Sequence, residues 1–225
     1  MISRKNNYMA RNRLHKVYAT ALATYKVLYI CASAGYGKTT SVESWLASQE
    51  LEYSLYNAED DSFLKNIETH KGNANKIVVI DNLSSVQNQS EQSSIFQYIL
   101  NSKAKFILIS RIKDISYLMP LRIVGQLTTV GEEELAFTAE ELNEYVPTQK
   151  VALSNDEKVQ LYADTRGMPI YIAISLHYIK NSNYGPEVYE KMKRDYFHYL
   201  DYALLNILII TRLTIFQYNY FYEFV

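Results

Sequence analysis

The sequence predicts an α/β protein built on a mostly parallel, doubly wound β-sheet. Three short apolar runs are typical of strands buried on both faces of such a sheet; they are Val27–Ala32, Lys76–Asp81 and Lys105–Ser110. Helical stretches separate these runs, as right-handed crossovers between parallel strands require. A glycine-containing turn follows the first run and leads into one of those helices.

Weaker sequence patterns predict the remaining helices and strands of the sheet region. A helix is expected from Lys38 to about Ser48, with Val42, Trp45 and Leu46 on its buried face. Further strands are expected at Glu52–Tyr56 and Gly125–Val130, further helices at Ser62–His70 and Glu91–Leu100, and a loop at Lys71–Asn75.

The chain changes character after Gly131, where strand-like runs stop. Thr138–Glu141 and Ser154–Glu157 each place a glutamate three residues after a hydroxyl side chain, which is the pattern of a capping box at the start of a helix. Gly167-Met168-Pro169 interrupts the pattern before another helix, Ile170–Lys180. We therefore expect a sheet domain over residues 1–130, a helical subdomain over 131–184, and a third segment over 185–225 with helices at about 187–199 and 202–213.

Composition excludes some classes of partner. The 225 residues carry a net charge of −1, so no global basic field would hold nucleic acid. The basic residues near the N-terminus are interpreted as a solvated segment; they are Arg4, Lys5, Arg11, Arg13 and Lys16. The single cysteine, Cys31, excludes an internal disulfide and fits a reducing, cytoplasmic compartment.

Neither end of the chain predicts a membrane segment. Met1–Arg13 is basic and polar and has no apolar core of a signal peptide. The apolar stretch Tyr202–Val225 is interrupted by Asn206, Arg212 and Gln217, which favours a buried helix and an aromatic segment over a membrane span.

The turn after the first strand has the composition of a phosphate-binding loop. It follows the pattern G-x-x-x-x-G-K-[ST], with Ala32 in place of the first glycine. Backbone N–H groups of such a turn face phosphate oxygens, while Lys38 adds a charge near the β- and γ-phosphates and Thr39 binds Mg²⁺. The sequence thus predicts a P-loop NTPase fold with ATP or ADP and Mg²⁺ as cofactors. The expected binding residues are Ser33, Ala34, Gly35, Tyr36, Gly37, Lys38, Thr39 and Thr40.

Two later strand ends carry further candidate residues. Asp81 closes an apolar strand, where a carboxylate beside a phosphate loop is the expected Mg²⁺ ligand. Arg111 follows another strand and is placed to contact the γ-phosphate. Asn82 stands where many ATPases have a second acid, and an amide is no base at neutral pH, so at most weak hydrolysis is expected.

These motifs resemble those of the STAND signal-transduction ATPases, in particular the large LuxR-type activators that include the maltose regulator. The resemblance rests on residues 32–40 with Trp45, on Leu121–Thr138, and on Arg166-Gly167-Met168-Pro169. It implies that Pro169 packs near the adenine, that the nucleotide domain self-associates, and that residues 185–225 begin a winged-helix-like domain. The family's sensor repeats and DNA-binding domain have no counterpart in this sequence.

Three functions remain open on this evidence. The resemblance favours an ATP-binding switch module of a transcription regulator. The short interval from Lys38 to Asp81, together with the end of the sequence at Val225 inside the winged-helix-like segment, also favours a non-catalytic remnant of such a protein. A small P-loop phosphotransferase is the third possibility, with residues 131–184 as its lid and Arg122 and Arg166 as lid cations.

Overall fold

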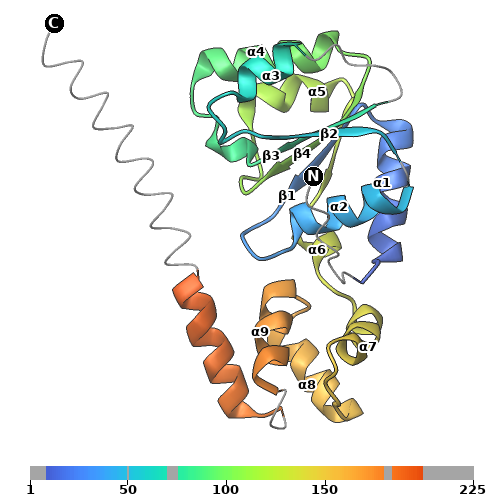
Figure 1. Ribbon diagram of the computed structural model, residues 1–225, viewed down its shortest axis with the longest axis vertical. Helices are drawn as coiled ribbons and strands as arrows, with labels where there is room; N and C mark the ends of the chain where they lie inside the picture. Colours follow the sequence, from blue (N-terminus) through green and yellow to red (C-terminus); the bar gives the residue numbers. More distant parts are fainter. Residues whose placement is uncertain (1–8, 50, 70–75, 180–183, 200–225) are drawn as a thin grey trace, which may run out of the picture. The chain divides into compact units, whose positions relative to one another are not determined.

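The computed structural model describes residues 9–49, 51–69, 76–179 and 184–199. The chain forms two compact units, residues 1–141 and residues 142–225, which are described separately (Figure 1). Within the described residues, no helix combines the length and the apolar character needed to cross a membrane.

The first unit is built on a five-stranded sheet in the order β2-β3-β4-β1-β5, and every strand pair is parallel. The strands are β1 (Val27–Cys31), β2 (Tyr53–Asn57), β3 (Ile77–Asp81), β4 (Lys105–Ser110) and β5 (Leu127–Val130). All five lie within about two residues of their expected positions. The α/β fold class with a parallel sheet is therefore confirmed.

Helices cover both faces of this sheet (Figure 1). The helices of the first unit are α1 (Asn12–Thr24), α2 (Lys38–Gln49), α3 (Phe63–Thr69), α4 (Gln89–Asn101), α5 (Met119–Ile123) and α6 (Glu132–Leu135). Alternate residues of β1 enter different cores: Leu28 and Ile30 pack with α1 and α2, whereas Val27, Tyr29 and Cys31 pack with α3 and α4. This alternation is the doubly wound arrangement, and Val42, Trp45 and Leu46 are buried on α2 as expected.

Helix α1 corrects the interpretation of the N-terminal basic residues as a solvated segment for Arg11 and Arg13. Lys16 is exposed as expected, and Arg4 and Lys5 lie outside the described residues. Leu14 and Tyr18 are fully buried, and the Tyr18 hydroxyl lies 2.8 Å from Ser41 Oγ on α2. Arg11 is only 8% exposed. The amphipathic spacing of the apolar residues, rather than the local charge, decides that this segment packs on the sheet.

The buried Arg11 is paired with groups at the end of the first unit. Its guanidinium donates to the carbonyl of Leu135 at 2.7 Å, to that of Ala136 at 2.6 Å and to Glu141 Oε2 at 2.7 Å. Arg13 donates to the same Glu141 oxygen at 3.1 Å. Burial would raise the pKa of Glu141, but the hydrogen bonds and charge of the two arginines outweigh it and hold that pKa below its ordinary value.

Helices also make up the described part of the second unit. They are α7 (Ala139–Thr148), which begins in the first unit, α8 (Asn155–Thr165), α9 (Pro169–Ile179) and a helical stretch over residues 186–199. Both expected capping boxes are present, because Glu141 and Glu157 exchange hydrogen bonds with Thr138 and Ser154. The expected loop at 71–75 and helix at 202–213 lie outside the described residues. The division at residues 130 and 184 stays a prediction.

The Glu141 contacts generate the first prediction. Glu141→Gln leaves Arg11 as a buried cation without its counter-charge, which should lower the free energy of unfolding by about 3 kcal/mol near neutral pH. The folded pKa of Glu141 lies below its ordinary value of 4.5. The wild-type advantage should therefore be complete above that value and decline as the pH falls below it.

Urea denaturation of wild type and variant across this pH range measures the effect. The matched control is Glu144→Gln, which changes an exposed glutamate of α7 and should leave stability nearly unchanged. An equal loss in both variants, or a difference independent of pH, would contradict the assignment.

Candidate functional site

The turn between β1 and α2 has the backbone of a tight, glycine-dependent loop. It spans residues 32–37, from the end of β1 at Cys31 to the first residue of α2 at Lys38. Gly35 has φ 91° and Gly37 has φ 67°, values at which a side chain is strained. The two glycines of the sequence motif therefore occupy the two positions of the loop that have positive φ. The loop ends at the N-terminus of α2.

Lys38 is directed back at this loop. Its ammonium group donates to the carbonyl of Ala32 at 2.7 Å and to that of Ser33 at 2.9 Å. Burial, followed by the positive charge of Arg111, lowers the pKa of Lys38 to about 8. The negative charges of Asp81 and Glu132 act in the opposite direction.

The end of β3 lies against the start of α2. Thr39 Oγ1 donates to Asp81 Oδ2 at 2.6 Å, although the two residues are 42 positions apart in the chain. The other carboxylate oxygen, Oδ1, accepts the backbone N–H of Asn82 at 2.7 Å. Asn82 itself adopts a left-handed conformation, with φ 55°, and its amide donates to Asn57 Oδ1 at 3.1 Å. Asn57, at the end of β2, was not among the residues singled out from the sequence.

The sequence-predicted residues thus fall into two groups. Residues 33–40, Asp81 and Arg111 all belong to the first unit, at the loop or at the ends of β3 and β4. Arg111 is exposed and close enough for its charge to act on Lys38. Pro169 is the first residue of α9 in the second unit, and its expected contact with adenine stays a prediction.

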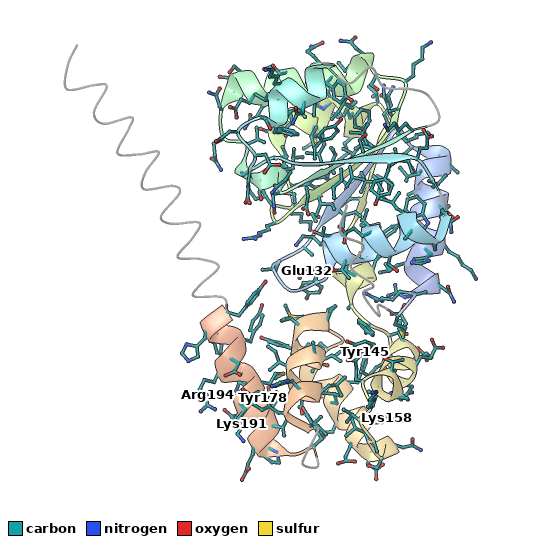
Figure 2. All side chains as sticks on the ribbon, in the orientation of Figure 1. Glu132, Tyr145, Lys158, Tyr178, Lys191 and Arg194 are labelled. Atoms are coloured by element: carbon teal, nitrogen blue, oxygen red, sulfur yellow. The ribbon has the colours of Figure 1, made fainter. Side chains whose placement is uncertain are left out.

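Glu132 is a residue of this site that sequence reasoning missed. Its Oε1 accepts the backbone N–H of Ser33 at 2.9 Å and the Ser33 hydroxyl at 2.6 Å. These two hydrogen bonds, with a further one from Tyr36 and the charge of Lys38, lower the pKa of Glu132. Figure 2 labels Glu132 on α6, next to the loop. The available signal was topological: β5 pairs with β1, so the residues after β5 must lie beside the loop after β1.

The oxygen donors at Thr39 and Asp81 suit a hard divalent cation. Mg²⁺ in nucleotide sites is held by one or two protein oxygens together with phosphate oxygens and water. No group of three or more His, Cys, Asp or Glu side chains among the described residues is placed to hold a metal. The pair therefore fits a cation that arrives with a phosphate ligand.

Solved structures of ATPases have a fold similar to that of this chain. A Walker-type ATPase of Pyrococcus abyssi matches 93% of this chain and 77% of its own, with a TM-score of 0.57 at 10% identity. The match to the Holliday junction branch migration motor RuvB of Thermotoga maritima covers 82% of this chain and 68% of RuvB, with a TM-score of 0.53 at 13% identity. The match to a substituted form of the same RuvB covers 83% of this chain and 70% of that protein, with a TM-score of 0.54 at 14% identity. No family model and no curated protein matches the sequence.

The environment of Lys38 generates the second prediction. Because its pKa is lowered to about 8, its amine should react with an acylating reagent at a half-maximal pH near 8. Peptide mass spectrometry across a pH series measures this midpoint, with the exposed Lys103 as the internal reference. A Lys38 midpoint of about 10 or above would show that burial does not destabilise its ammonium form.

Proposed function

We propose that this chain is an ATP-binding switch module of a transcription regulator of the LuxR-type STAND class. The observation that carries the proposal is the hydrogen bond between Thr39 and Asp81. It joins the phosphate-loop hydroxyl to the strand-end carboxylate, and these are the two protein oxygens that a nucleotide-bound Mg²⁺ requires. The similarity in fold to solved ATPases supports nucleotide binding. The role in a transcription regulator rests on the resemblance of the motifs to those of the LuxR-type STAND ATPases.

In this proposal the loop would hold the phosphates, and Thr39 and Asp81 would hold Mg²⁺. The backbone N–H groups of residues 33–40 and the dipole of α2 face the phosphate oxygens. Lys38 would exchange its loop carbonyls for the β- and γ-phosphates, and Mg²⁺, if held by Thr39 and Asp81, would neutralise part of the phosphate charge. Each of these groups already lies at one edge of the sheet.

Arg111 and Pro169 would make the site responsive to the state of the nucleotide. The charge of Arg111 next to Lys38 favours contact with a γ-phosphate, which ADP lacks. By the family resemblance, Pro169 would pack near the adenine. Because a ligand shifts a conformational equilibrium only through contacts that differ between the states, the γ-phosphate is the group that distinguishes ATP from ADP.

The proposal includes at most slow hydrolysis. Asn82 stands next to the metal-site carboxylate, and its amide donates to Asn57, so no carboxylate base occupies that position. Binding without turnover fits a signalling module. Self-association, a cytoplasmic location and a role in transcription come with the family resemblance.

Isothermal titration with ATP and ADP tests the proposal. Lys38→Ala removes a charge-assisted contact and should weaken ATP binding by about 1.5–3 kcal/mol. Lys103→Ala removes an exposed lysine elsewhere in the first unit and should bind as wild type does. Absence of binding in the wild-type chain would support the non-catalytic remnant, and consumption of ATP that depends on an added acceptor would support the phosphotransferase.

Asp81→Asn tests the metal site separately. The substitution keeps an oxygen that accepts from Thr39 but removes the charge that attracts Mg²⁺. The ratio of ATP affinities with and without Mg²⁺ should fall by about tenfold, while affinity in the presence of EDTA stays within a factor of about two. An unchanged ratio would refute the placement of Asp81 at the metal.

A further inference from the structure

Glu132 places a carboxylate on the loop that the proposed function assigns to phosphates. Its Oε1 accepts both the N–H and the hydroxyl of Ser33, at 2.9 and 2.6 Å. Tyr36 also hydrogen-bonds to Glu132, so the carboxylate contacts the loop on both sides of Ala34 and Gly35. Its negative charge reaches Lys38, the cation that would bind the phosphates.

The other two glutamates of α6, Glu133 and Glu134, differ from Glu132 in their surroundings. Glu134 Oε2 accepts the backbone N–H of Gly131 at 2.8 Å, which caps the helix to which it belongs. Glu133 is exposed. Glu132 is therefore the glutamate of α6 that contacts the loop through Ser33, whereas Glu134 caps α6. A substitution of Glu132 can thus change the site without removing the cap of the helix.

We propose that Glu132 determines which nucleotide the site prefers, by opposing negative charge at the phosphate loop. This inference rests on the proposed function, because it concerns the same site. Every added phosphate group brings more negative charge next to the Glu132 carboxylate. ATP is consequently disfavoured more than ADP, and ADP more than AMP. Because the Glu132 side chain is exposed, the penalty is modest and weakened by salt.

The test uses Glu132→Gln, which keeps an oxygen for Ser33 but removes the charge. Binding of ATP, ADP and AMP is measured by titration calorimetry without Mg²⁺, at about pH 7, where Lys38 stays mostly protonated because its pKa is about 8. We expect the variant to bind ATP about two- to fivefold more tightly than wild type does. The gain should be smaller for ADP, absent for AMP, and reduced when salt is raised to about 0.5 M.

Two controls separate charge from geometry. Glu133→Gln removes the same charge from the next position and should change ATP affinity by a smaller factor. Glu132→Ala removes charge and acceptor together; a gain in ATP affinity as large as that of Glu132→Gln supports the charge effect. Thermal unfolding of each variant verifies that the fold is retained.

The outcomes distinguish this inference from the proposed function. Equal gains for all three nucleotides, no change, or weaker ATP binding in Glu132→Gln would overturn the inference, provided that wild type binds ATP and Lys38→Ala binds it more weakly. If wild type and Glu132→Gln both fail to bind any of the three nucleotides, the proposed function and the inference are overturned together.

Discussion

The candidate site depends on one constraint, which is that all strands of the sheet run parallel and neighbouring strands end within about one residue of each other. Cys31 pairs with Ser110, and Asn57 pairs with Asp81, so β1 with β4 and β2 with β3 finish at common levels. With a strand spacing of about 4.8 Å, β1 and β3 lie about 10 Å apart on either side of β4. The loop after β1 and the first turn of α2 cross that distance, which lets Thr39 reach Asp81. An antiparallel or shifted strand would move the carboxylate away from the loop.

The lowered pKa of Lys38 indicates that an anionic ligand would stabilise its ammonium form. Burial and Arg111 disfavour the ammonium form, whereas Asp81 and Glu132 favour it but do not restore the ordinary pKa. A bound anion would raise this pKa, so by linkage the protonated form of Lys38 binds an anion more tightly. Two loop carbonyls hold the ammonium group only as neutral acceptors. Phosphate oxygens, which are charged acceptors, are the stronger partners for such a group.

Much of the sheet and the loop follows from local sequence patterns, and the rest does not. Continuous apolar runs identify β3 and β4 because strands buried on both faces tolerate little else. Helix α1 was missed because Arg11 and Arg13 read as solvated, and their counter-charge, Glu141, lies 130 residues away from Arg11. Glu132 was missed for a similar reason: its partner Ser33 is 99 residues away and becomes a neighbour only through the pairing of β5 with β1. Contacts between residues that only the strand order brings together cannot be recognised from the local sequence pattern.

Two glutamates of the segment from Glu132 to Glu141 make contacts of unequal strength within the first unit. Glu132, at one end, is partly solvated, and ion or hydrogen-bond contacts of this kind contribute up to about 1 kcal/mol. Glu141, at the other end, is paired with the buried Arg11, and loss of one partner of such a pair costs about 3–5 kcal/mol.

Arg11 also holds the carbonyls of Leu135 and Ala136, so the end of α6 is fixed by the stronger contacts. A phosphate group at the loop would therefore compete more readily with the contact between Glu132 and Ser33 than with the contacts of Arg11.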